Sequence, residues 1–241
     1  MIMNAVGRLL RWISAPLLLI IAFAAFTLLA SACLHASDQL YNQGLKAWLW
    51  LFIPLAFCLR AILAWFFRRL GADNPLAFID TLEHELTHAA FGYLTFHPPL
   101  SLKASLKGDG EVALRGKSLL AILAPYFFPL WTFIAVGITS LLESRFRFWA
   151  TAFCMCLIGN FVFRWMAEFR WRQTDLHAYG FFFSSAFVAC ALAMSFGFLL
   201  AMLRLCPWHW PMKLPSASWQ LMLSLWAHIE PWLQKAWLKS T

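Results

Sequence analysis

Long apolar segments, separated by short polar connections, constrain the fold of this chain more than any other feature. They cover about residues 13–33, 47–67, 76–96, 118–142, 149–167 and 178–203. A helix needs roughly 20 mostly apolar residues to cross the hydrocarbon core of a bilayer, and each segment is near that length. The pattern predicts an all-α polytopic membrane protein with about six transmembrane helices.

The overall composition supports a membrane protein and argues against a nucleic-acid partner. Hydrophobic residues make up 62% of the 241 residues and charged residues only 12%, about half of the charged fraction of a typical soluble domain. The net charge is +8, but the Lys and Arg residues are scattered between the apolar segments. Such scattered basic residues suit anionic lipid head groups better than DNA or RNA. We therefore expect the lipid bilayer, and no nucleic acid, among the partners.

The first apolar segment has a second interpretation. Arg8 and Arg11 precede it, and Ala30-Ser31-Ala32-Cys33 ends it, so this region also resembles a cleavable signal peptide. The segment is longer than the apolar core of a usual signal, which favours an uncleaved first span. The basic residues beside the later spans do not agree on one orientation under the positive-inside rule, so the orientation stays open.

The segment 76–96 carries the run His84-Glu85-Leu86-Thr87-His88, an H-E-x-x-H motif. On a helix, residues four apart share one face, so His84 and His88 can offer two imidazole nitrogens to one metal ion. Glu85 lies beside that face, where it can accept a proton from a metal-bound water. The alternative is a helix with two structural histidines. Ionisable groups within an apolar span are costly and usually functional, which favours the metal site.

Two histidines do not complete a catalytic zinc site, which needs a third protein ligand and an open position for water. Seven residues are candidates for that ligand: Asp175, His177, Glu168, Glu143, His97, Asp109 and Glu111. Counting spans places the connection before the last span on the same membrane side as the end of the H-E-x-x-H helix. Asp175 in this connection also lies at the mouth of a helix, where it can dip towards the middle of the segment 76–96, so it ranks first, followed by His177 and Glu168.

Asp80 precedes His84 by four residues and so lies on the same helical face. Its carboxylate could orient the His84 imidazole from outside the ligand set. It could equally be a solvated residue near the start of the helix. The sequence leaves both interpretations open.

Residues 100–115 have the pattern of a β-hairpin. Leu100, Leu102 and Ala104 alternate with polar residues, and Gly108-Asp109-Gly110 supplies a tight turn. An extended edge next to a metal site could pair with an unwound substrate strand. The hairpin could also simply lie on the membrane.

Pro125 and Pro129 interrupt the apolar segment 118–142. Proline breaks within a membrane are tolerated where neighbouring groups or water satisfy the freed carbonyls. We therefore expect a broken helix that borders the cavity.

The order of these features resembles the site-2 protease family of intramembrane zinc metalloproteases over roughly residues 75–190. The resemblance is carried by the H-E-x-x-H motif in a span, the hairpin, Ala124-Pro125, Asn160 and Asp175. Two details depart from the family pattern. Ala124-Pro125 stands where the family has Gly-Pro, and Thr174-Asp175-Leu176 replaces its Leu-Asp-Gly motif. No regulatory insertion of the PDZ type is present.

The resemblance implies a role for each matching residue. His84, His88 and Asp175 would hold Zn²⁺, and Glu85 would be the general base. Asn160 would help to hold the substrate.

The resemblance also divides the chain into three parts. Residues 1–75 would form an N-terminal transmembrane hairpin of two spans, and residues 76–206 the catalytic core. Residues 207–241 form an amphipathic tail in which Trp, Leu and Met recur at helical spacing. Its polar residues and prolines argue against a seventh span, so we expect a C-terminal interfacial helix.

We therefore expect a multi-pass intramembrane zinc metalloprotease of the bacterial inner (plasma) membrane. It would hydrolyse peptide bonds in or next to the transmembrane segments of membrane proteins. One alternative is a membrane metalloprotease with Glu168 as the third ligand. Another is a non-catalytic, metal-stabilised membrane scaffold or chaperone. The sequence does not indicate the natural substrate, the oligomeric state or the mode of regulation.

Overall fold

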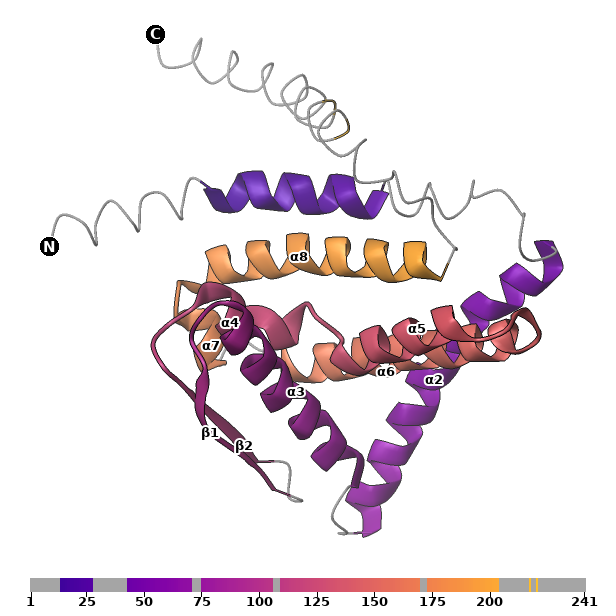
Figure 1. The fold of residues 1–241 in the computed structure, drawn as a ribbon, viewed down its shortest axis with the longest axis horizontal. Coiled ribbons are helices and arrows are strands. Elements are labelled where there is room, and N and C mark those ends of the chain that lie inside the picture. Colours follow the sequence, from indigo (N-terminus) through magenta and orange to yellow (C-terminus); the bar gives the residue numbers. More distant parts are fainter. Residues whose placement is uncertain are drawn as a thin grey trace, which may run out of the picture.

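The structure is a computed structural model that describes residues 14–27, 43–70, 75–105, 109–169 and 173–203, with Ala217 and Gln220 (Figure 1). The described part is mostly helical, with one small sheet. A helix over Ser14–Thr27 comes first. The remaining elements are α2 (Gln43–Leu70), α3 (Pro75–Leu94), β1 (Pro99–Ala104), β2 (Gly110–Leu114), α4 (Leu119–Leu123), η1 (Ala124–Tyr126), α5 (Leu130–Leu141), α6 (Ser144–Glu168), α7 (Thr174–His177) and α8 (Phe181–Met202). The predicted interfacial tail helix lies outside the described residues, apart from those two positions.

Among the residues that the structure describes, three helices are long and apolar enough to cross a membrane. They are Trp48–Leu70 within α2, Arg145–Glu168 within α6, and Phe181–Met202. The pair formed by Leu119–Tyr126 and Leu130–Leu141 would be a fourth span if it is counted as one, although its two parts are bent by 77°. The chain thus has the helices of a membrane protein, while the predicted number of six spans is not confirmed.

The two other predicted spans, 76–96 and 13–33, are not among the helices long and apolar enough to cross a membrane. Helix α3 has 20 residues, but it carries three carboxylates, on Asp80, Glu83 and Glu85. In the first segment, the described helix Ser14–Thr27 is shorter than a bilayer crossing.

Helix α3 begins and ends where its sequence predicts. Pro75 opens it, and proline suits the first helical position because its missing N–H has no intrahelical partner there. At the other end, the N–H of His97 donates to the carbonyl of Gly92 at 2.8 Å. Phe96, with φ of 60°, occupies the left-handed position of this helix end. The buried residues of α3 include Glu85, His88 and Gly92, which share one face of the helix.

The predicted hairpin is confirmed. Strands β1 and β2 are antiparallel, with Leu102 opposite Val112 and Ala104 opposite Gly110. The hairpin lies beside α3 (Figure 1). At Gly110 an added Cβ would lie 2.5 Å from Thr81 Cγ2 and 2.6 Å from Glu85 Oε1, so the absence of a side chain lets β2 approach the motif helix. The predicted apolar face is exposed at Leu100 and Leu102.

The predicted break between the two proline positions is also confirmed. Pro125 lies in η1, and Pro129 caps α5. Across the break, the carboxylate of Glu83 on α3 accepts a hydrogen bond from the backbone N–H of Trp131 at 3.1 Å. A side chain of the motif helix thus satisfies one of the free N–H groups at the start of α5.

Helices α2 and α6 pack at very short range around Gly159. A Cβ at this position would overlap the backbone carbonyl of Ile53 on α2. We expect Gly159→Ala to lower the free energy of unfolding by about 1–3 kcal/mol, because a backbone carbonyl cannot move aside as a flexible side chain can. The melting temperature of the purified chain in detergent measures this effect.

Gly137→Ala is the matched control for this prediction. Gly137 also lies inside a helix, and a Cβ there would meet nothing within 4 Å. Alanine is a better helix former than glycine, so this variant should be as stable as the original chain or slightly more stable. Equal melting temperatures for the two variants would refute the proposed close contact between α2 and α6.

Candidate metal centre

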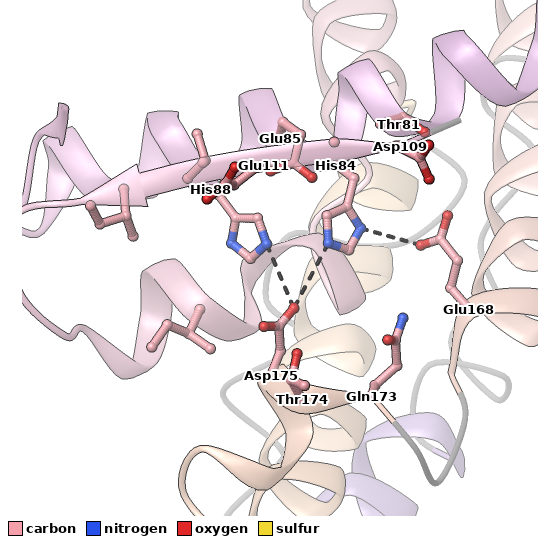
Figure 2. Close-up of a pocket in the computed structure, with 14 residues that line it drawn as sticks. Thr81, His84, Glu85, His88, Asp109, Glu111, Glu168, Gln173, Thr174 and Asp175 are labelled. Atoms are coloured by element: carbon pink, nitrogen blue, oxygen red, sulfur yellow. Dashed lines mark hydrogen bonds and ion pairs between the residues drawn. The ribbon is translucent and has the colours of Figure 1, made fainter. Parts of the chain in front are cut away.

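A cavity of about 570 Å³ opens beside the H-E-x-x-H run (Figure 2). Residues from α3, the hairpin, α4, α6 and the region of α7 surround it. The polar side chains among them are Thr81, His84, Glu85, His88, Asp109, Glu111, Glu168, Gln173, Thr174 and Asp175. Four predicted site residues therefore reach one cavity, although Asp175 is separated from the motif by almost ninety positions in the sequence.

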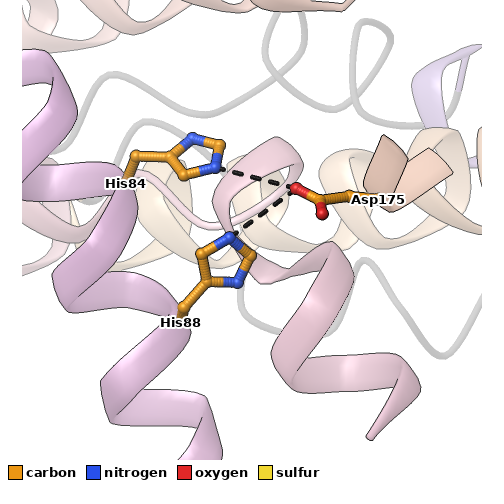
Figure 3. Close-up of side chains that lie close together, drawn as sticks. All are labelled: His84, His88 and Asp175. Carbon is orange, nitrogen blue, oxygen red and sulfur yellow. Dashed lines mark ion pairs between the residues drawn. The ribbon is translucent and has the colours of Figure 1, made fainter. Parts of the chain in front are cut away.

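His84, His88 and Asp175 form a group that could hold a metal ion, because their ligand atoms all lie within 4.8 Å of one another. Asp175 Oδ2 lies 3.9 Å from His84 Nε2 and 3.8 Å from His88 Nε2 (Figure 3). Ligands of a tetrahedral zinc ion at about 2.1 Å are roughly 3.4 Å apart. The three donors are therefore close to the spacing that one small divalent cation needs.

The second nitrogen of each imidazole has its own partner. Nδ1 of His88 lies 2.7 Å from the carbonyl oxygen of Ala121. Because a carbonyl only accepts hydrogen bonds, this Nδ1 carries the proton and its Nε2 keeps a lone pair for a metal. Nδ1 of His84 lies 3.3 Å from Glu168 Oε2. A carboxylate also accepts, so Nδ1 of His84 carries the proton and its Nε2 keeps a lone pair. Metal-binding histidines are commonly oriented in this way.

Asp175 comes from the short helix α7 and is held by an aromatic residue. The hydroxyl of Tyr126 donates a hydrogen bond to its Oδ2 at 3.2 Å. Tyr126 is buried, and its ring packs edge-on against His84. Burial acts to raise the pKa of the Asp175 carboxyl, but in the metal-free chain the imidazoles of His84 and His88, when protonated, and the hydroxyl of Tyr126 lower that pKa by more. The group is therefore charged at neutral pH, as a metal ligand must be.

Glu85 is buried on α3, the helix of both histidines, and lines the cavity beside them. Its carboxyl group packs against β2 at Gly110. This placement puts the predicted general base next to the metal-binding group, and its catalytic role stays a prediction.

Glu168, the alternative third ligand, takes a different position from Asp175. It contacts Nδ1 of His84, on the side of the ring away from Asp175, whereas Asp175 faces Nε2 of both histidines. Figure 2 shows these two carboxylates on opposite sides of the His84 ring. The geometry therefore favours Asp175 as the ligand. His177, the other alternative, packs against Phe181 and does not line the cavity.

Asp80 contacts a cation instead of a histidine. Its carboxylate pairs with the guanidinium of Arg60 on α2, and Arg60 is buried. In the described part of the chain, Glu168 occupies the place beside His84 that the sequence suggested for Asp80. The buried Arg60 needs a counter-charge, and the Asp80 carboxylate supplies it.

Asn160 is half-buried in α6, one helical turn before Arg164, and does not line the cavity. Its predicted role in holding the substrate stays a prediction.

Several contacts at this site lie beyond what the sequence indicated. Tyr126 and the Ala121 carbonyl come from the broken segment, and only its prolines pointed to the cavity. Arg164 and Glu83 form a buried ion pair at 2.5 Å. Their presence within apolar segments was the available signal, because charges there are usually paired or functional.

Comparisons with known proteins add no identification. No protein-family model, no curated protein and no solved structure matches this chain. The likeness to site-2 proteases therefore rests on the motif and on its surroundings.

Proposed function

We propose that this chain is an intramembrane zinc metalloprotease that hydrolyses peptide bonds in or next to transmembrane segments of other membrane proteins. One observation carries the proposal. His84, His88 and Asp175 converge on one cavity that Glu85 also lines, and the described part of the chain includes three helices long and apolar enough to cross a membrane. The bacterial inner membrane is the proposed location.

The donor set is compatible with zinc. Two neutral imidazoles and one carboxylate are typical of catalytic zinc sites that leave a position open. His84 and His88 would supply Nε2, and Asp175 would supply Oδ2. When bound, zinc would polarise the scissile carbonyl and lower the pKa of a water molecule towards neutrality.

The chain's own residues would perform the proton transfers. Glu85 would accept a proton from the attacking water and then pass it to the leaving amine, as a single carboxylate can act first as base and then as acid. Tyr126 would hold Asp175 in place through its hydroxyl hydrogen bond. Glu168 and the Ala121 carbonyl would keep each imidazole turned towards the cavity.

The hairpin gives the cavity an extended wall. Strand β2 contributes Gly110, Glu111, Val112 and Leu114 to the lining. A helical substrate hides its carbonyls in its own hydrogen bonds and must unwind before attack. An unwound segment could then add to the edge of the hairpin through backbone hydrogen bonds.

The test is a cleavage assay with the full chain in detergent and a fluorescent transmembrane peptide as substrate. We expect a strong zinc chelator to abolish cleavage and added Zn²⁺ to restore it, because the proposed reaction depends on the metal. Cleavage that persists without zinc would contradict the proposal. Zinc binding without any cleavage would instead support a metal-stabilised scaffold or chaperone.

A further inference from the structure

Arg164 of α6 is a deeply buried cation close to the motif helix, with 3% of its surface exposed. A buried charge is costly unless it is paired and hydrogen-bonded. Nη1 of Arg164 contacts Glu83 Oε2 at 2.5 Å and donates to the backbone carbonyl of Asp80 at 3.3 Å. Arg164 is therefore fixed against α3, the helix that carries both histidines.

The same guanidinium also faces Glu168. Nε of Arg164 lies 3.9 Å from Glu168 Oε1, one helical turn further along α6. The second oxygen of that carboxylate, Oε2, lies 3.3 Å from His84 Nδ1. One carboxylate thus connects a buried arginine to an imidazole of the proposed metal centre.

This connection has a clear physical consequence. Glu168 is 28% exposed, so its side chain would otherwise sample several rotamers. Attraction to a fixed guanidinium favours the rotamer that accepts from His84. A negative carboxylate at Nδ1 also makes Nε2 a stronger donor to a metal.

We propose that Arg164 and Glu168 are positioning residues for the metal centre, acting through His84. Arg164 holds the Glu168 carboxylate, and Glu168 fixes the tautomer and orientation of the His84 ring. The inference rests on the proposed function only in requiring that His84 binds a metal. Neither residue belongs to the group of His84, His88 and Asp175 that could hold the metal.

Arg164 also has a structural role that the test must separate from positioning. Its partner Glu83 accepts from the backbone N–H of Trp131 and so ties α3 to the start of α5. Loss of Arg164 alone would leave Glu83 as an unpaired buried charge and could prevent folding. The variants below therefore change the two carboxylate partners of Arg164 separately.

The experiment compares Glu168→Gln with Glu83→Gln in the purified full chain. Zn²⁺ affinity is measured by competition with a chelating indicator, and the visible absorption spectrum of bound Co²⁺ reports ligand geometry. We expect Glu168→Gln to raise the zinc Kd about 10–100-fold, the usual effect of removing such a partner, and to shift the Co²⁺ bands. Glu83→Gln should lower the melting temperature and raise the zinc Kd by clearly less than Glu168→Gln does, because Arg164 keeps its hydrogen bond to the Asp80 carbonyl and its attraction to Glu168.

A second comparison tests whether Arg164 and Glu168 act together. Arg164→Gln is combined with Glu83→Gln, so that neither residue leaves an unpaired buried charge. This double variant should have a higher zinc Kd than Glu83→Gln alone. Adding Glu168→Gln to that double variant should raise the zinc Kd by much less than Glu168→Gln does in the original chain. The effects of two residues that act through the same contact are not additive.

Three results would overturn the inference. They are an unchanged zinc Kd in Glu168→Gln, an equal rise in Glu83→Gln, or full additivity of the Arg164 and Glu168 effects. A chain that binds zinc with the expected variant pattern but cleaves no peptide would contradict only the protease proposal.

Discussion

Replacing Glu85 by Gln is expected to abolish peptide-bond cleavage while zinc still binds. The amide keeps the size of the side chain that packs against Gly110, but it cannot accept the proton of the attacking water. General acid–base catalysis contributes about 10²–10⁴-fold to a rate, so kcat should fall by at least about a hundredfold. Cleavage of a fluorescent transmembrane peptide and zinc content are measured on the same preparation.

Glu143→Gln is the control for this prediction. Glu143 is also a glutamate, but it is exposed, pairs with Arg145, and lies outside the cavity. This variant should cleave at the original rate. Full activity in Glu85→Gln would end the proposed mechanism, because no other residue has been assigned as the general base.

Asp175→Ala is expected to remove stable zinc binding. Asp175 is the one acidic residue in the group that faces Nε2 of both histidines. Without it, the two imidazoles would have to hold the ion alone, so the loss of affinity should exceed the about 10–100-fold change expected for a partner outside the ligand set. Zinc content after dialysis and competition with a chelator provide the measurement.

Glu168→Ala is the variant to compare with it. It should bind zinc more weakly than the original chain but clearly more tightly than Asp175→Ala, because Glu168 contacts only Nδ1 of His84. The reverse order, with zinc retained in Asp175→Ala and lost in Glu168→Ala, would make Glu168 the third ligand.

Local features of the fold could be predicted from the sequence because local chemistry determines them. Pro75 fixes the start of α3, the alternation after Pro99 gives the hairpin, and Pro125 and Pro129 break the following helix. The spacing of four residues in the motif places both imidazoles on one helix face.

The number of spans was harder to predict, because apolar length alone does not decide whether a helix crosses a membrane. Helix α3 is long enough, but Asp80, Glu83 and Glu85 make it the most acidic of the long helices. Two of these carboxylates are neutralised by arginines on α2 and α6. The third lines the cavity. These charges suit a helix enclosed by protein better than one exposed to lipid.

The partners of the site residues depended on contacts that sequence spacing does not encode. Asp80 was chosen for its distance from His84 along one helix, but Glu168 reaches that histidine from α6. The tertiary fold brings α3 and α6 near enough for their long side chains to make that contact. Asp175 ranks above Glu168 in the sequence because it lies at the mouth of the last span, on the same membrane side as the end of the motif helix, and the geometry of the cavity favours the same ranking.

The most direct test of the central idea is anomalous diffraction at the zinc absorption edge, from crystals of the full chain grown with Zn²⁺. We predict one anomalous peak bound by Nε2 of His84, Nε2 of His88 and the carboxylate of Asp175, with Glu85 beside it. No peak between the two imidazoles, or a peak bound by Glu168 in place of Asp175, would contradict this account.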